Sequence, residues 1–263
     1  MTGKRLRAFR LAIVLAVGAT ALIAGGCGSS TKTSTASATR SSTTRSITTT
    51  APADPGTAAG GGLSADAVAV AAGTPITHAA FEHWLAIAAK SEAAASSTKV
   101  PPVDPSDPPD FNNCIAQARH YPSLAKTSRQ ELKANCSQLF RTLSAQVMSF
   151  LIESDWYLGY AARLRLVPSN AQVAGALNAA KAKQFPTEAG FRAFLEQTGQ
   201  TVADVRFRFE INLIAARLAA RHKGTQSAKT AAVASEIKRA FLSSTVCTPL
   251  VLMADCGNYH APG

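Results

Sequence analysis

The longest helical pattern of the chain runs through residues 127–166. Its apolar side chains recur three and four positions apart, which is the spacing of one face of an α-helix. The stripe consists of Leu132, Cys136, Leu139, Phe140, Leu143, Val147, Phe150 and Leu151, and Met148, Ile152 and Trp156 widen it. A stripe this wide is typical of a helix that packs against more than one neighbour. We expect the helix to begin after Thr127 or Ser128 and to stop before Pro168.

Shorter helical patterns lie on both sides of this segment, separated by capping residues, glycine or proline. They predict helices over residues 78–95, 170–184, 188–198, 202–223 and 229–242. Residues 97–126 hold six prolines and are predicted to form an irregular loop. Only residues 68–71 and 248–253 have the composition of β-strands. The pattern therefore predicts a mostly α domain over residues 63–263, which ends in a tail at residues 243–263.

Residues 1–26 have the features of an export signal. An apolar run of 14 residues at 11–24 follows four basic residues, and the basic residues are Lys4, Arg5, Arg7 and Arg10. The run is shorter than the roughly 20 residues of a spanning helix, so it predicts a signal peptide. Ala24-Gly25-Gly26-Cys27 resembles the bacterial lipobox, which prefers Leu where this chain has Ala24. The resemblance implies a lipid on the Cys27 sulfur and an anchor on the extracytoplasmic face of the cell membrane; ordinary cleavage of a secreted protein is the alternative.

Composition separates a tether from the domain that follows it. Residues 27–62 are almost entirely Ser, Thr, Ala, Gly and Pro. They cannot bury enough apolar surface to offset the entropy of ordering, so we expect a flexible tether. The formal net charge is +11, and it falls to +7 when the four basic residues of the signal segment are removed; this modest positive charge suits an anionic membrane surface, although a solvated basic face is the simpler explanation. The basic residues form no stripe with interleaved aromatics, so nucleic-acid binding is not expected.

Four cysteines follow Cys27, namely Cys114, Cys136, Cys247 and Cys256. An even number in an exported protein indicates two disulfide bonds, for which three pairings are open. We favour the local pairing, Cys114 with Cys136 and Cys247 with Cys256, because each pair brackets a turn-rich or short segment. A zinc site is the competing explanation, but the spacings fit no C-x₂-C pattern, so no metal is expected.

No catalytic motif is evident in the sequence, so we assign no catalytic residue and no cofactor. Nucleophile-elbow, P-loop and dinucleotide-binding motifs are all missing from it. Two of the five histidines, His78 and His83, are five positions apart and so do not share a helix face as the ligands of an HExxH zinc site would. Glu82 and Glu92 are expected to be exposed on the first helix.

Four groups of residues form an ordered series of motifs along residues 65–225. They are residues 68–77 with Phe81, His83, Trp84 and Leu85, then 146–152 with Trp156, then 167–173, and finally 183–195. In their order and spacing these motifs resemble the SurA/PrsA foldase family. The chaperone domain of that family opens with a strand, a G-x-x-I-T turn and a helix. It continues with a long core helix, a V-S-D-A-E-V helix start and a segment spaced as K-x-x-F followed by F-x-x-x-L.

The tail is similar to the extreme C-terminus of exported lipoprotein foldases of this family. The similarity lies in Phe241, Cys247, Cys256, Asn258 and Tyr259. Where those proteins carry a parvulin-type peptidyl-prolyl isomerase domain, this chain has only residues 225–246, which are too few for it. The resemblance thus implies a SurA N-terminal-like helical domain without the isomerase. It also implies a two-stranded β element, in which residues 68–71 lie beside a tail strand near residues 250–253.

The function implied by the resemblance is that of a membrane-tethered chaperone, which holds unfolded or nascent secreted proteins without catalysis. The alternatives are a peptidyl-prolyl isomerase or an accessory subunit of one, and an interaction lipoprotein that binds one folded partner. A chaperone of this kind needs accessible apolar surface. The helices carry more apolar positions than a narrow stripe requires, notably Trp84, Phe150, Trp156, Phe207 and Ile214. We expect Trp84, Phe150 and Trp156 to lie at a peptide-binding cleft, with complete burial of both tryptophans as the alternative.

Overall fold

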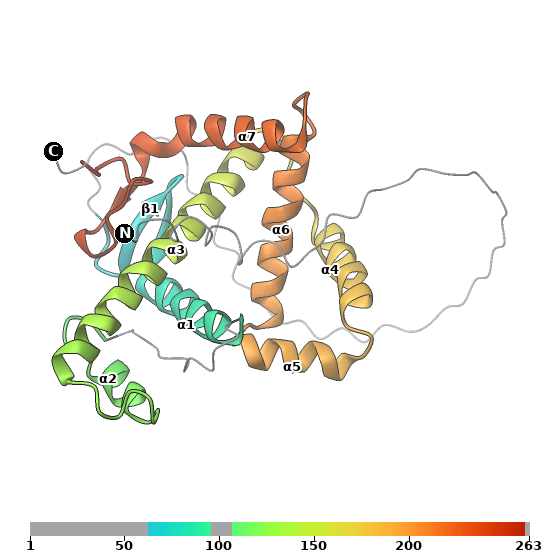
Figure 1. Ribbon diagram of the computed structural model, residues 1–263. Helices are drawn as coiled ribbons and strands as arrows, with labels where there is room; N and C mark the ends of the chain where they lie inside the picture. The colour runs from blue at the N-terminus through green and yellow to red at the C-terminus, as the bar shows by residue number, and fades with distance from the viewer. Residues whose placement is uncertain (1–62, 96–106, 261–263) are drawn as a thin grey trace, which may run out of the picture. The chain divides into compact units, whose positions relative to one another are not determined.

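The computed structural model describes residues 63–95 and 107–260. The signal segment, Cys27, the tether and part of the proline-rich loop lie outside the described residues. Within the described part the chain forms seven α-helices and three short β-strands (Figure 1). The helices are α1 (His78–Ala95), α2 (Asn112–Arg119), α3 (Arg129–Arg163), α4 (Asn170–Gln184), α5 (Glu188–Thr198), α6 (Val202–Ala219) and α7 (Gln226–Phe241).

Hydroxyl side chains begin the last five of these helices. Each side-chain oxygen accepts a hydrogen bond from the backbone N–H three residues further along, which satisfies a group that the helix itself leaves unpaired. The capping residues are Ser128, Ser169, Thr187, Thr201 and Thr225. Gly199, with φ of 68°, ends α5 in the left-handed conformation that glycine adopts without strain. These caps explain why the helix limits lie close to those predicted.

The β element has three strands rather than the two predicted. Strands β1 (Ala67–Ala71), β2 (Thr74–Thr77) and β3 (Val246–Cys247) form an antiparallel sheet in the order β2–β1–β3. The sequence indicated a turn at residues 73–74 and a helix cap at Thr77. The cap is confirmed, because the Thr77 hydroxyl accepts the Ala80 N–H at 3.1 Å, but residues 74–77 also form β2. Ala72 and Gly73 both have positive φ, 51° and 81°, as a two-residue hairpin turn requires. That turn folds β2 back onto β1 before α1 begins.

The tail does lie beside β1, but the predicted position of its strand is wrong. Strand β3 is at residues 246–247, and residues 249–251 form a short 3₁₀ helix instead of the strand predicted near 250–253. The Thr248 N–H still donates to the Val68 carbonyl at 2.9 Å. The next residue, Pro249, has no N–H to continue the ladder and starts the 3₁₀ turn. The two ends of the domain are therefore joined through a very short strand pair.

Helix α3 contacts α1, α2, α6, α7 and β1, and it provides many of the buried apolar side chains.

No described helix combines the length and the apolar character that crossing a bilayer would need. Helix α2 lies inside the segment predicted to be a loop, and the Cys114–Cys136 disulfide ties it to α3. The carboxylate of Asp107 accepts backbone N–H bonds from Asn113 and Cys114, which supports the first turn of this short helix.

Both disulfide bonds have the local pairing that we favoured. Cys114 bonds Cys136 across 22 positions, with Cα atoms 6.2 Å apart, and Cys247 bonds Cys256 across nine positions, with Cα atoms 5.8 Å apart. From these loop lengths, the loss of chain entropy in the unfolded state stabilises the fold by about 3 kcal/mol for each bond. The first bond ties α2 to α3, and the second closes a loop within the tail.

Candidate functional site

Helices α1, α3 and α6 meet around three aromatic rings, Trp84, Phe150 and Phe207, which we call the aromatic cluster. The Trp84 ring lies 4.8 Å from Phe150 and 6.0 Å from Phe207, and Phe150 and Phe207 are 6.0 Å apart, all measured between ring centroids. Rings attract one another at these separations. Trp84 is only 7% exposed, whereas Phe150 and Phe207 are half-buried. Two of the three rings therefore keep part of their apolar surface in contact with solvent.

The guanidinium of Arg208 lies over this cluster. Its central carbon is 5.1 Å from the ring centroid of Trp84 and 5.4 Å from that of Phe150, which are cation–π distances. The Nε atom is buried and has no hydrogen-bond partner. Burial lowers the pKa of Arg208, and the charge of Asp204 opposes that change. The aromatic cluster thus combines an apolar surface with a cation that lies over two of its rings.

Asp204 occupies the same face of α6, because positions 204, 207 and 208 are three and four residues apart. Its carboxylate closes a capping box with Thr201, and accepts bonds from the backbone N–H and the hydroxyl of Thr201, each at 2.7 Å. The His83 ring on α1 approaches it at 2.8 Å. Burial by itself raises the pKa of Asp204, but these bonds from Thr201 and His83 outweigh it and lower the pKa. Asp204 therefore links α1 to the start of α6.

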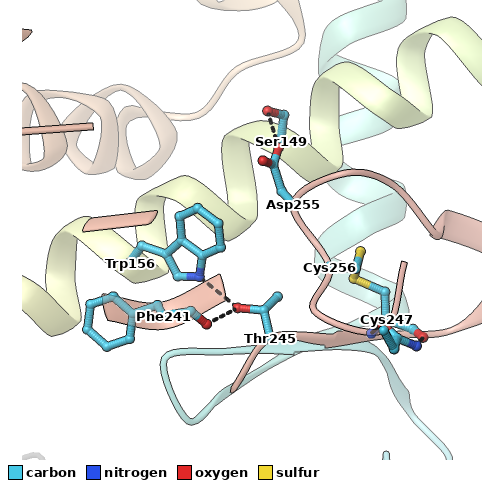
Figure 2. Close-up of a disulfide and its surroundings, with 8 residues drawn as sticks. Ser149, Trp156, Phe241, Thr245, Cys247, Asp255 and Cys256 are labelled. Carbon is cyan, nitrogen blue, oxygen red and sulfur yellow. Dashed lines mark hydrogen bonds between the residues drawn. A yellow bond between two sulfur atoms is a disulfide. The ribbon is translucent and has the colours of Figure 1, made fainter. Parts of the chain in front are cut away.

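The structure brings two of the three predicted peptide-binding residues together and leaves the third apart. Trp84 and Phe150 belong to the aromatic cluster. Trp156 is 2% exposed, and its Nε1–H donates to the Thr245 hydroxyl at 2.8 Å, on the side of α3 that faces the tail (Figure 2). Trp156 is therefore a core residue that holds the tail, and Trp84 also presents little surface. The burial of both tryptophans therefore favours the alternative interpretation, in which neither of them lines a cleft.

Two residues beside the aromatic cluster, Asp204 and Arg208, were not predicted from the sequence. Their spacing of four shows that they share a helix face. Nothing in a single sequence, however, shows which other helices pack on that face. Phe207 was noted only as an apolar position in excess of a narrow stripe. The burial of Arg208 between helices distant in sequence is a tertiary property, and no local signal could have indicated it.

The tail, which the Cys247–Cys256 disulfide closes on itself, is attached to α3 and α7 by polar bonds. Asp255 accepts a hydrogen bond from Ser149 at 3.3 Å (Figure 2). It also pairs with Lys238 at 2.8 Å. Burial raises the pKa of Glu153, and the charge of Asp255 raises it further. The tail therefore covers the side of α3 on which Trp156 lies.

Both edges of the sheet are closed to an additional strand. The side-chain amide of Asn258 bonds the backbone N–H and C=O of Cys247, at 3.1 and 2.9 Å, and so occupies the outer edge of β3. The other edge strand, β2, carries Pro75, which has no N–H to donate. An extended peptide adds to a sheet by bonding such edge groups. The sheet is therefore a poor receptor for an unfolded chain.

Asp155 on α3 is the one described carboxyl group whose pKa burial raises to about 7. A base with such a pKa suits proton transfer near neutral pH. Asp155 makes no hydrogen bond or ion pair with another described residue, so no nucleophile or second titratable group is held against it. Within residues 63–95 and 107–260, no three His, Cys, Asp or Glu side chains lie together as a metal site requires. The described residues assemble no recognisable catalytic arrangement around it.

Comparison of the chain with protein-family models, with curated proteins and with solved structures finds no match. The resemblance to the SurA/PrsA family therefore depends on the sequence motifs alone and stays a prediction. What the structure shows is a mostly helical domain with a small three-stranded antiparallel sheet.

Proposed function

We propose that this protein is a lipid-anchored, extracytoplasmic chaperone, which holds unfolded exported chains at the aromatic cluster without catalysing proline isomerisation. The observation that carries the proposal is the half-buried state of Phe150 and Phe207 beside the buried Trp84. A holding site needs apolar surface that remains accessible in the folded protein. Aromatic and arginine side chains are also the residues that contribute most at protein interfaces.

The placement outside the cytoplasm is supported by the two disulfide bonds of the described domain. Disulfides persist in oxidising compartments and are rare where thiols are kept reduced. The lipobox-like sequence at Cys27 supports a lipid anchor in the membrane, and the predicted tether would let the domain move away from that anchor. A flexible tether of about 35 residues, as the composition of residues 27–62 predicts, would have a root-mean-square span of roughly 30–35 Å. A domain on such a tether can sample chains near the membrane surface.

Side-chain contacts, rather than strand addition, are the mode of binding that we propose. The Asn258 side chain covers the edge of β3, and Pro75 leaves the edge strand β2 without one N–H donor, so a client cannot easily add a strand at either edge. Half-buried phenylalanine rings accept apolar side chains of many shapes, which suits binding to unrelated clients. Such binding would be weak for any single segment and would not require fixed chemistry.

An aggregation assay with matched variants tests the proposal. The purified chain should slow the aggregation of several unrelated unfolded proteins, and Phe207→Ala should weaken that protection. Loss of the contacts of one phenylalanine ring, about 1.5 kcal/mol or more, corresponds to roughly tenfold in the concentration needed. Phe194→Ala is the control, because Phe194 on α5 is also half-buried but belongs to a separate ring group, with Phe191 on the same helix and Phe185 at the end of α4.

The outcomes separate the proposal from its alternatives. Protection that is lost in Phe207→Ala and kept in Phe194→Ala supports holding at the aromatic cluster. Acceleration of a proline peptide beyond its uncatalysed relaxation of tens to hundreds of seconds would indicate an isomerase instead. Protection of no unfolded client, together with tight binding of one folded protein, would indicate an interaction lipoprotein.

A further inference from the structure

Arg208 is a half-buried cation without a hydrogen bond among the described residues. Its Nε atom is shielded from solvent and has no acceptor. The Nη1 and Nη2 atoms also have no partner in the described part of the chain, but they are not fully buried. Buried donors are nearly always paired, and one that is not needs a physical explanation. Nε is out of reach of a ligand, but the two outer nitrogens lack an acceptor among the described residues as well, and a ligand can supply one to them.

The carboxylate closest in sequence on the same helix face does not supply it. Asp204 lies one turn before Arg208, but its oxygens already accept bonds from His83 and from the Thr201 N–H and hydroxyl. Its charge reaches Arg208 without a direct bond between the two side chains. The fold thus uses Asp204 to fix α1 against α6, and leaves the guanidinium unpaired over the rings of Trp84 and Phe150.

We infer that Arg208 binds a carboxylate of the held chain, at a point where an apolar side chain of that chain packs on Phe150 and Phe207. The inference rests on the proposed holding function and names the segments that it selects. A guanidinium presents parallel N–H donors that match the two oxygens of a carboxylate. The rings cover the plane of the guanidinium and orient it, while its outer nitrogens remain accessible. Partial burial strengthens a charge pair that water would otherwise screen.

Two kinds of segment carry this group, and peptides can distinguish them. One is an acidic side chain beside an aromatic or aliphatic residue; the other is the terminal carboxylate of a chain with an apolar last residue. The probes are fluorescent aromatic peptides in four forms, which have an internal Glu or Gln and a free or amidated C-terminus. Binding to the purified full chain is measured by fluorescence anisotropy for the wild type, Arg208→Gln and Arg208→Lys. Arg119→Gln, an exposed arginine on α2, is the control.

A carboxylate-bearing peptide should bind about 10- to 100-fold more tightly than its neutral counterpart, as a charged hydrogen-bonded pair implies. Arg208→Gln should abolish that advantage and leave binding of the neutral peptide, Arg208→Lys should keep only part of it, and Arg119→Gln should change neither. The form that shows the advantage, internal Glu or free C-terminus, identifies the source. If neutral and acidic peptides bind the wild type equally, the inference is wrong while holding stands. If no peptide binds at all, the proposed function fails as well.

Discussion

Replacement of Thr245 by valine should destabilise the fold measurably, because it breaks the bond that holds the tail on α3. Thr245 is fully buried, and its hydroxyl accepts from Trp156 Nε1 at 2.8 Å and donates to the Phe241 carbonyl at 2.9 Å. Valine keeps the shape and removes the oxygen. The Phe241 carbonyl retains a bond from the Ser244 hydroxyl, so only the Trp156 N–H is left buried without a partner. That loss costs about 1–3 kcal/mol.

The assay is urea unfolding followed by tryptophan fluorescence, which reports on Trp84 and Trp156 alone because the chain has two tryptophans. Thr245→Ser is the matched control, since it keeps the oxygen and loses only a methyl group. Thr245→Val should be less stable than Thr245→Ser as well as less stable than the wild type. Equal stability of the valine and serine variants would refute the idea that the Trp156–Thr245 bond stabilises the joined ends of the domain.

Three further changes have definite expected outcomes. Cys27→Ser should release the protein from membranes, measured by fractionation, because stable anchoring requires the diacyl group; retention at the wild-type level would contradict the lipid anchor. Burial raises the pKa of Asp155 to about 7, so between about pH 4 and pH 7 the native state retains a proton that the unfolded chain has lost, and stability falls as pH rises. Asp155→Asn should remove that dependence and raise the free energy of unfolding near pH 8 by at most about 4 kcal/mol, measured by urea titration with Glu82→Gln as control. If stability depends on pH in the same way in Asp155→Asn and in Glu82→Gln, the expectation is wrong. Gly257→Ala should lower the free energy of unfolding by about 1–3 kcal/mol in the same titrations, because its Cβ would collide with the Leu242 carbonyl oxygen and the backbone would have to move; unchanged stability would contradict this close packing of the tail.

Most helices could be predicted because local chemistry sets their limits. Thr187 and Gly199 mark the ends of α5 within the sequence itself, as a hydroxyl cap and a left-handed glycine. Helix α2 could not be predicted in the same way. It follows Phe111 in a left-handed conformation, and it depends on Asp107 and on the disulfide to Cys136 for support. Strand β3 is only two residues long and exists because β1 lies beside it.

The candidate site was foreseen only in part, for a related reason. The aromatic residues Trp84 and Phe150 could be named from the excess of apolar positions on their helices. The role of Trp156 could not, since its partner Thr245 is 89 positions away and the pair forms only in the folded chain. Arg208 reads in the sequence as one of many basic residues. Its burial over the rings depends on how three helices meet, which no local pattern encodes.

Site-specific crosslinking tests the central claim of holding at the aromatic cluster most directly. A photo-crosslinking phenylalanine derivative is placed at Phe207 in one form of the chain and at Phe194 in another, and each is illuminated with several unrelated unfolded proteins. Holding at the cluster predicts crosslinks from position 207 to every unfolded client and few or none from position 194. Equal crosslinking at the two positions, or none at 207, would contradict it.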